Sequence, residues 1–280
     1  MKPDRPAPPV PSPWSSSSRP RAPQRAAREP RAGARAAETR LYGVNACRAA
    51  FAHRPEALRK VYLLESRITA FKPVLAWCVK HRVGYRVVEA DDLDRLTASR
   101  HHEGVCFDLV RRAPLDVAGL LAQVPAAPAA SLLLWLDGVG NPHNFGALLR
   151  SAAHFGAAGV ITPADVELSG AAARVAEGAA EVVPLAQAGA AAEAVAALRA
   201  HGFAIAATVP RAGTPLYATA LPPRLVLVFG AEGEGMSQAL IEAADLRLTI
   251  PGSGQVESLN VAASVAVVLG EYWRAHAPHA

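Results

Sequence analysis

The stretch "VESLNVAASVAVVLG", Val256–Gly270, joins a strongly apolar segment to a polar start. Its apolar residues recur at the close spacing of a buried helix. Ser258 and Asn260 stand just before this run and directly follow the turn "IPGSGQ". Both residue types are favoured helix N-caps, because a side-chain oxygen can accept from unpaired N–H groups of the first turn. Capping alone would explain them, but so would a binding site at the mouth of the helix.

Two other segments repeat the design of a strand, a glycine-containing loop and a polar residue. In "LDGVGNPHNFGALLRSAAHFG" a strand ends at Asp137 and a helix begins near Asn144, which could itself be only an N-cap. An apolar stripe on one side of this helix puts Arg150 roughly opposite, either on a solvated surface or facing a ligand cleft. In "LVLVFGAEGEGMS" a buried strand runs into three glycines and two glutamates, the first of which is Glu232.

The glycine spacing of this last segment disfavours two common phosphate-binding loops. Gly230, Gly233 and Gly235 do not fit G-x-G-x-x-G, and the segment lacks the Gly-Lys-Ser/Thr of a Walker loop. Its two glutamates would repel a phosphate, so a cationic or uncharged ligand fits better, and an exposed acidic turn is the simpler alternative. A dinucleotide-dependent oxidoreductase is therefore disfavoured.

Alternating strands and helices predict two α/β domains, a small one at 40–111 and a larger one at 131–276. In the first domain, strands are expected at 61–64, 85–88 and 104–110, with helices at 70–81 and from Asp91. In the second, strands are expected at 132–137, 158–162, 181–185, 203–208, 224–230 and 246–250. Their continuous apolar character indicates a mostly parallel sheet covered on both faces. Residues 112–130, which are rich in proline, are expected to form a linker, and ligands are expected at the carboxyl ends of the strands.

The basic charge of the chain is concentrated at its start. Residues 1–40 hold nine Lys or Arg and three acids, whereas the formal net charge of the whole chain is only +5. The abundance of Pro, Arg, Ala and Ser predicts a disordered tail over 1–39. Such a tail suits a polyanion, and a solubilising extension without a specific partner is an equal alternative.

Cysteine content and hydropathy predict a cytoplasmic, soluble protein. Cys47, Cys78 and Cys106 form no CxxC pair, which argues against a disulfide framework or a zinc site and fits a reducing compartment. No apolar run reaches the roughly 18 residues that a membrane span needs. The first residues also lack the apolar core of a secretory signal.

In order and spacing, the three segments resemble the motifs of the SpoU/TrmH family of RNA 2′-O-ribose methyltransferases, within the SPOUT superfamily. Asn144 and Arg150 match an N-x5-R motif, "GAEGEGMS" matches the second motif and "IP…VESLNV" the third. This resemblance covers roughly 132–273. The preceding segment, up to "HHEGVCFDL", resembles the small α/β RNA-binding domain of many members. Gly252, Ala262 and the Glu of "HEGV" depart from residues that the family often has there.

The resemblance implies methyl transfer from S-adenosylmethionine to a ribose 2′-hydroxyl of rRNA or tRNA, by a homodimer with a trefoil-knotted, mostly parallel sheet and without a metal. The implied catalytic residues are Asn144, Arg150, Glu232, Ser258 and Asn260. The implied cofactor-binding residues are Thr208, Gly230, Gly235, Ile250 and Leu259.

Two questions about the implied site stay open. A guanidinium rarely gives up its proton, so Arg150 is as plausible in orienting and stabilising charge as in acting as a base. Ser258 and Asn260 are expected both to cap their helix and to line the site. The main alternative is a non-catalytic RNA-binding protein that keeps the knot, and the retained polar residues count against it.

Removal of residues 1–39 is expected to leave folding unchanged, to weaken RNA affinity and to flatten its salt dependence, because each phosphate contact releases counterions. Titration with RNA at several salt concentrations measures this effect. An unchanged salt slope would show that the tail does not bind phosphates.

Overall fold

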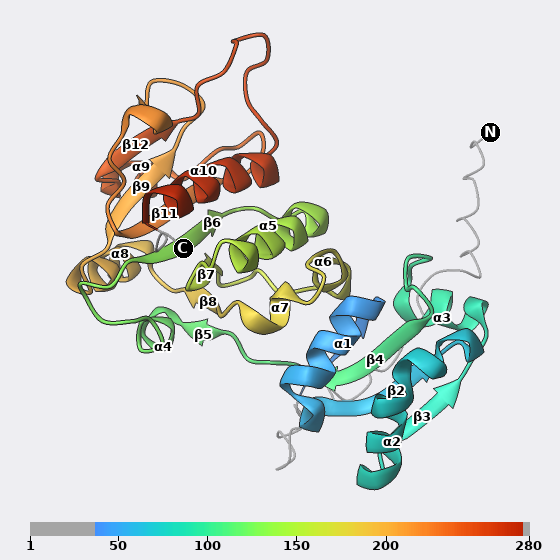
Figure 1. Cartoon of the computed structure of the whole chain (residues 1–280). Coiled ribbons are helices and arrows are strands. Elements are labelled where there is room, and N and C mark those ends of the chain that lie inside the picture. The colour runs from blue at the N-terminus through green and yellow to red at the C-terminus, as the bar shows by residue number, and fades with distance from the viewer. Residues whose placement is uncertain (1–36, 277–280) are drawn as a thin grey trace, which may run out of the picture. The chain divides into compact units, whose positions relative to one another are not determined.

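The computed structural model describes residues 37–276 (Figure 1). The predicted basic tail therefore lies almost wholly outside the described residues. Its expected end at residue 39 is wrong, because a strand already begins at Glu38 and pairs with Val110. The segment "ETRLY" is too short to show an alternating pattern, and pairing with a neighbouring strand makes it extended. A tail deletion that preserves this strand ends at residue 36.

The first part of the chain forms a four-stranded sheet in the order β1-β4-β2-β3. Its strands are β1 (Glu38–Tyr42), β2 (Leu58–Leu63), β3 (Gly84–Val87) and β4 (Val105–Val110). Its helices are α1 (Val44–His53), α2 (Lys72–His81) and α3 (Ala90–Thr97), with 3₁₀ turns η1 (Pro55–Ala57), η2 (Glu65–Arg67) and η3 (Thr69–Phe71). β4 runs antiparallel to β1 and β2, whereas β2 and β3 are parallel. The predicted strands and helices of this part are found within a few residues of their expected places.

The second part forms an eight-stranded sheet in the order β10-β12-β9-β11-β6-β7-β8-β5, with every pairing parallel. Its strands are β5 (Leu115–Asp116), β6 (Ser131–Asp137), β7 (Gly159–Pro163), β8 (Leu185–Ala188), β9 (Ala204–Thr208), β10 (Thr214–Pro215), β11 (Arg224–Gly230) and β12 (Leu246–Thr249). Its helices are α4 (Val117–Leu121), α5 (Pro142–His154), α6 (Gly170–Val175), α7 (Ala179–Val182), α8 (Ala191–Ala200), α9 (Gln238–Ala243) and α10 (Val261–His276), with the 3₁₀ turn η4 (Leu216–Ala218). The predicted mostly parallel α/β sheet is confirmed.

Two expectations for this part are wrong. The range 112–130, expected as a linker, contains β5 at the edge of the large sheet and α4, whose Leu120 is fully buried. The strand expected at 181–185 is mostly α7, and the strand begins only at Leu185. Both segments are too short for periodicity to identify, so packing against the sheet decides their conformation.

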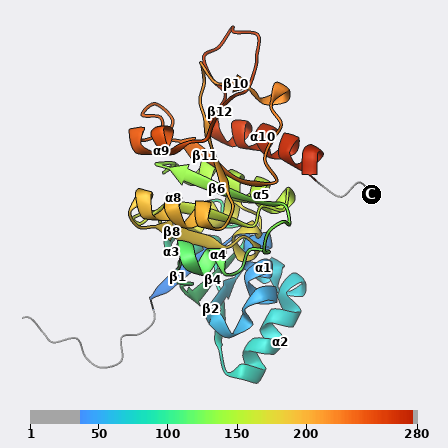
Figure 2. The same cartoon turned by 90° about the vertical axis from the view of Figure 1, so that its left-hand side faces the viewer.

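Helices cover both faces of the large sheet (Figures 1 and 2). One buried cluster joins the sheet to α5, α6, α7 and α10, and a second joins it to α4, α8 and α9. The expected apolar stripe of α5 is buried: Phe145, Leu148, Leu149 and Ala152. Within residues 37–276, no helix combines the length and the apolar character needed to cross a membrane.

The three cysteines are buried as free thiols in the first part of the chain. Burial raises the pKa of the Cys106 thiol to about 12 and also raises the pKa of Cys47 and Cys78. These thiols therefore stay protonated at neutral pH and act as small apolar core residues.

Helices α6 and α7 contact the small sheet and α1 closely. Gly178 has a φ of +95°, and a Cβ there would lie 2.8 Å from the Cβ of Ala49. Beside this contact, the Arg54 guanidinium donates to both oxygens of Glu181, over 2.7 and 2.9 Å. The two side chains are only 14% and 7% exposed, so this ion pair is mostly buried. It connects the domain of the small sheet to the domain of the large sheet.

Arg54→Met is expected to lower the free energy of unfolding by about 3 kcal/mol, because it leaves the buried Glu181 carboxylate with a weaker partner. Urea unfolding measures the loss. The control is Arg95→Met, which removes an exposed partner of Asp92 and should cost less than about 0.5 kcal/mol. Equal losses in the two variants would contradict the importance of the buried pair.

Candidate functional site

The candidate site lies where the large sheet's central strands end. Gly230, the last residue of β11, pairs in register with Asp137, the last residue of β6. The loop after β6 leads into α5, and the loop after β11 carries Glu232. Parallel pairing therefore brings two of the predicted motifs to one edge, as expected for ligand sites in such sheets.

Asn260 joins the three motifs through its side-chain amide. Its Nδ2 donates to Asn144 Oδ1 over 3.1 Å and to Glu232 Oε1 over 2.8 Å. The same Glu232 oxygen accepts from the Val261 backbone N–H over 3.2 Å. Three of the five predicted catalytic residues thus contact one another, although Asn144 and Asn260 are 116 residues apart in the chain.

Asn260 is also the residue that caps α10. Its Oδ1 accepts from the N–H groups of Ala262 and Ala263 over 2.9 and 3.4 Å. The expectation that Ser258 caps as well is not met, because Ser258 makes no hydrogen bond within the described residues and is exposed. One residue with both an acceptor and a donor therefore combines the two roles that were expected of the pair.

Asn144 is not an N-cap. Helix α5 begins at Pro142, and Asn141 caps it by accepting from the N–H groups of His143 and Asn144 over 2.8 and 3.5 Å. The Asn144 side chain is thereby left to accept from Asn260. The sequence did carry a signal for this start, since Asn before Pro is a common beginning of a helix.

The glycines of the second motif form a tight hairpin that presents Glu232. Ala231 and Gly235 exchange backbone hydrogen bonds of 2.9 and 3.0 Å, and Gly233 and Gly235 have positive φ values. A Cβ on Gly230 would lie 2.4 Å from the backbone of Gly235, so only glycine allows the strand to meet the turn. Replacement of Gly230 or Gly235 would therefore displace the Glu232 carboxylate.

Asp137 is a positioning residue that the sequence interpretation missed. Its Oδ2 accepts from the Ser237 N–H over 2.7 Å and so fastens the end of the glycine hairpin to β6. An acid as the last residue of an otherwise apolar strand, directly before Gly138, was the available signal.

Arg150 lies on the opposite side of α5 from its buried stripe, as expected, and its side chain is exposed. Six residues of helix separate it from Asn144, which corresponds to about 9 Å along the axis. Within residues 37–276 it forms no ion pair. The structure therefore places Arg150 on the helix that carries Asn144 but not in contact with the three joined residues.

Four of the five predicted cofactor-binding residues, Thr208, Gly230, Gly235 and Ile250, lie at or just after the ends of β9, β11 and β12, which are neighbours in the sheet. Thr208 ends β9 and donates its hydroxyl to Val228 O over 2.8 Å, so its side chain braces the sheet. Ile250 follows β12 and is half-buried, whereas Leu259 is exposed in the loop before α10.

This edge fits S-adenosylmethionine in its chemistry. It offers backbone groups at the strand ends, the apolar residues Ile250 and Leu259 in the segments around the loop after β12, and the carboxylate of Glu232 in the hairpin after β11. Such groups suit an uncharged heterocycle and a cationic amino-acid part rather than a phosphate. When bound, this compound supplies a methyl group already activated by its sulfonium.

Comparisons with known proteins agree with the motifs. Residues 131–270 match the model of the SpoU rRNA methylase family, and residues 40–114 match that of the RNA 2′-O ribose methyltransferase substrate-binding domain. The chain belongs to the SpoU family. Its expected membership, inferred from three short motifs, is confirmed.

Relatives and a solved structure support this assignment along most of the chain. An uncharacterized tRNA/rRNA methyltransferase, YfiF of Escherichia coli O157:H7, is 40% identical over 86% of this chain and 69% of its own length. The 23S rRNA (guanosine-2′-O-)-methyltransferase RlmB of Pasteurella multocida is 38% identical over 84% of this chain and 97% of its own. The SpoU methyltransferase AviRb of Streptomyces viridochromogenes, solved with AdoMet, shares the fold with a TM-score of 0.70, at 22% identity over 86% of this chain and 91% of its own.

Two substitutions of Asn260 are expected to separate its roles. Asn260→Ala should lower the free energy of unfolding by about 1 kcal/mol, because α10 loses its cap. Asn260→Ser should recover most of that stability, since serine caps equally well but is too short to join Asn144 and Glu232. Thermal and urea unfolding measure both. A serine variant as unstable as the alanine variant would mean that the bridge, not the cap, stabilises the helix.

Proposed function

We propose that this SpoU-family chain transfers a methyl group from S-adenosylmethionine to a ribose 2′-hydroxyl of ribosomal RNA. The observation that carries the proposal is the amide of Asn260, which joins Asn144 and Glu232 from three separate motifs. Ribosomal RNA is favoured over tRNA because the relative with an assigned reaction is a 23S rRNA guanosine-2′-O-methyltransferase that the chain covers almost completely.

The reaction sets three physical requirements for the protein. The 2′-oxygen must form a bond to the methyl carbon on the side opposite the breaking carbon–sulfur bond, so both must be held in line. The hydroxyl proton must leave as the new bond forms. The negative charge that develops on the ribose oxygen must be stabilised.

Glu232 and Arg150 meet the last two requirements. Glu232 Oε1 is fixed by Asn260 and by the start of α10, and Oε2 makes no hydrogen bond within the described residues. We assign Oε2 to accept the proton of the 2′-hydroxyl as the new bond forms. Arg150 offers a guanidinium that remains charged at neutral pH. We assign Arg150 to the ribose phosphate and to the developing charge on the 2′-oxygen, rather than to proton removal.

The backbone around Gly230, Gly235, Ile250 and Leu259 would hold the methyl donor. Thr208 would support it indirectly, through the hydrogen bond that joins the ends of β9 and β11. Ser258 lies in the exposed loop two residues before Asn260 and would contact the RNA or the donor from there. Loop residues 251–260 are all exposed, which leaves their backbone groups available to such ligands.

We further propose a cytoplasmic homodimer with a trefoil knot in the large domain. Tyr217 and Trp273 are large aromatic residues exposed in the last quarter of the chain, outside the loop assigned to ligands, and a partner subunit would cover them. Three free thiols fit a reducing compartment. We propose a substrate-binding domain that runs from β1 to β4 and a catalytic domain that begins with β5 and α4 and continues to the end of α10.

Arg150→Ala is expected to lower the rate of methyl transfer by about 10²–10³-fold, because it removes a group that stabilises charge in the transition state. Its unfolding free energy and its affinity for S-adenosylmethionine should stay unchanged, since the side chain is exposed and contacts none of the three joined residues Asn144, Glu232 and Asn260. Radiolabel transfer to rRNA, urea unfolding and calorimetric titration measure these three quantities.

Two comparisons sharpen the Arg150 experiment. Arg150→Lys keeps the charge but loses the fork geometry and should recover only part of the rate. Arg274→Ala removes an exposed arginine of α10 and should keep the full rate. Full activity in Arg150→Ala would exclude the assigned role, and a folded wild-type protein that never binds S-adenosylmethionine would favour a non-catalytic RNA binder.

A further inference from the structure

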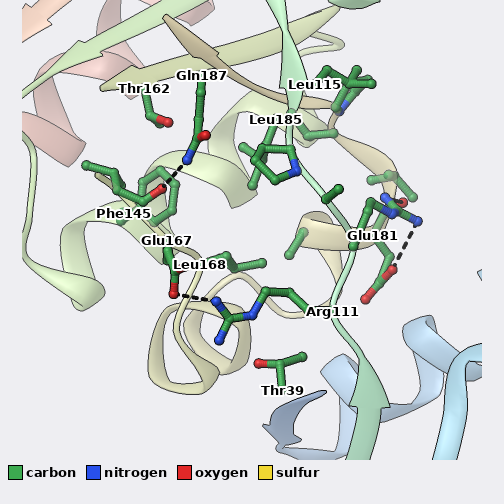
Figure 3. Close-up of a pocket in the computed structure, with 18 of the residues that line it drawn as sticks. Thr39, Arg111, Leu115, Phe145, Thr162, Glu167, Leu168, Glu181, Leu185 and Gln187 are labelled. Atoms are coloured by element: carbon green, nitrogen blue, oxygen red, sulfur yellow. Dashed lines mark hydrogen bonds and ion pairs between the residues drawn. The ribbon is translucent and has the colours of Figure 1, made fainter. Parts of the chain in front are cut away.

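A cavity of about 600 Å³ lies apart from the candidate site and contains none of the ten residues assigned to it (Figure 3). Its walls come from the segment 111–115, from the loop after β7, from α7 and β8, and from Phe145 of α5. The volume is within the range of pockets that enclose small ligands, and the lining is mainly apolar with a few polar groups, as is usual for such pockets.

Two polar side chains that line the cavity make only long hydrogen bonds. Gln187 Nε2 donates to Val166 O over 3.4 Å, and the Thr162 hydroxyl donates to Ala186 O over 3.5 Å. Both distances are at the long limit of a hydrogen bond, so a ligand can replace these contacts at small cost. The Gln187 carboxamide offers a donor and an acceptor side by side, which is the pattern that reads the edge of a nucleobase.

The charges around the cavity leave a surplus of one positive charge. Three guanidinium groups, those of Arg54, Arg111 and Arg112, face two carboxylates, those of Glu167 and Glu181. Arg111 pairs with Glu167 at 2.6 Å and Arg54 pairs with Glu181 at 2.7 Å. Arg112 is the third cation, and it reaches Glu181 only at 3.3 Å, with half of its side chain exposed. It can therefore turn to an anion that carries a single charge.

We propose that this cavity binds one nucleotide, with its base between the apolar walls and its phosphate at Arg112. A flat heterocycle matches the apolar lining with Phe145 and Leu185, and its polar edge matches Gln187 and Thr162. The single negative charge of an internucleotide phosphate matches the charge surplus, whereas a free 5′-monophosphate carries nearly two charges at neutral pH. The nucleotide comes from the RNA substrate, a source that rests on the proposed function, or from a free mononucleotide.

The cavity also has a direct connection to the candidate site. Phe145, which lines the cavity, follows Asn144, which accepts from Asn260. Both belong to the first turns of α5, so an occupant of the cavity contacts the same helical segment that holds the site together. Binding of a second RNA nucleotide here would help to hold this end of α5 while the target ribose is at the site.

The test uses the full chain and photo-crosslinking to a short rRNA fragment that carries thiolated nucleobases. The expected result is crosslinks, located by mass spectrometry, to residues that line the cavity, such as Phe145 or Gln187. Gln187→Leu keeps the side chain's size without its polar atoms, and Arg112→Gln removes the charge of the half-exposed guanidinium that contacts Glu181 only at 3.3 Å. Each should weaken RNA binding by about tenfold, as expected for the loss of a base-edge or phosphate contact. The matched control Arg274→Gln should not weaken it.

The two sources are separated by titration with 5′-mononucleotides without RNA. Mononucleotide binding that Gln187→Leu and Arg112→Gln both weaken would support a site for free nucleotides, and crosslinks without such binding would support an RNA nucleotide. No crosslink in the cavity, no mononucleotide binding and unchanged RNA affinity in both variants would overturn the proposal. The proposed function would still stand if the wild-type protein methylates rRNA, and it would fail separately if the protein does not bind S-adenosylmethionine.

Discussion

The carboxamide of Asn260 is the contact on which the site depends. Its oxygen caps α10, and its nitrogen donates to Asn144 and Glu232. A carboxylate in that position could cap the helix but could not donate, and a hydroxyl would be too short to reach both partners. The polar start of the most apolar helix therefore serves stability and site geometry at once. This dual use explains why the helix begins with an amide rather than with any other good cap.

The parallel sheet supplies the constraint that makes this contact possible. Because all strands of the large sheet are parallel, the loops after β6, β9, β11 and β12 leave from one edge. Gly230 brings the strand end against the glycine hairpin, and Asp137 fastens that hairpin to the neighbouring strand. Glu232 is thus held from both sides, by the sheet through its hairpin and by α10 through Asn260. Arg150 lies about 9 Å further along α5 with an exposed side chain, and the proposed function assigns it to the ribose phosphate.

The sequence predicted the long elements and the motifs, but not the short elements or the division of roles. Strands such as β6 and β11 are continuous apolar runs, and their identity follows from composition alone. β1, β5 and α4 are extended or helical only because a neighbouring strand pairs with them or a sheet buries them. The sequence alone does not distinguish Ser258 from Asn260 as the cap, because both residue types cap helices. The hydrogen bonds from the N–H groups of Ala262 and Ala263 identify Asn260 as the cap. The buried pair of Arg54 and Glu181 has no sequence signal, since its members are 127 residues apart.

The central claim is tested most directly by the chemical position of the transferred methyl group. The wild-type chain is incubated with S-adenosylmethionine labelled in its methyl group and with unmodified rRNA, and the RNA is then digested to nucleosides. The account predicts label in a 2′-O-methylnucleoside, with the adjacent phosphodiester resistant to alkali because the neighbouring hydroxyl is blocked. Label on a nucleobase, or no transfer by a folded protein that binds the methyl donor, would contradict it.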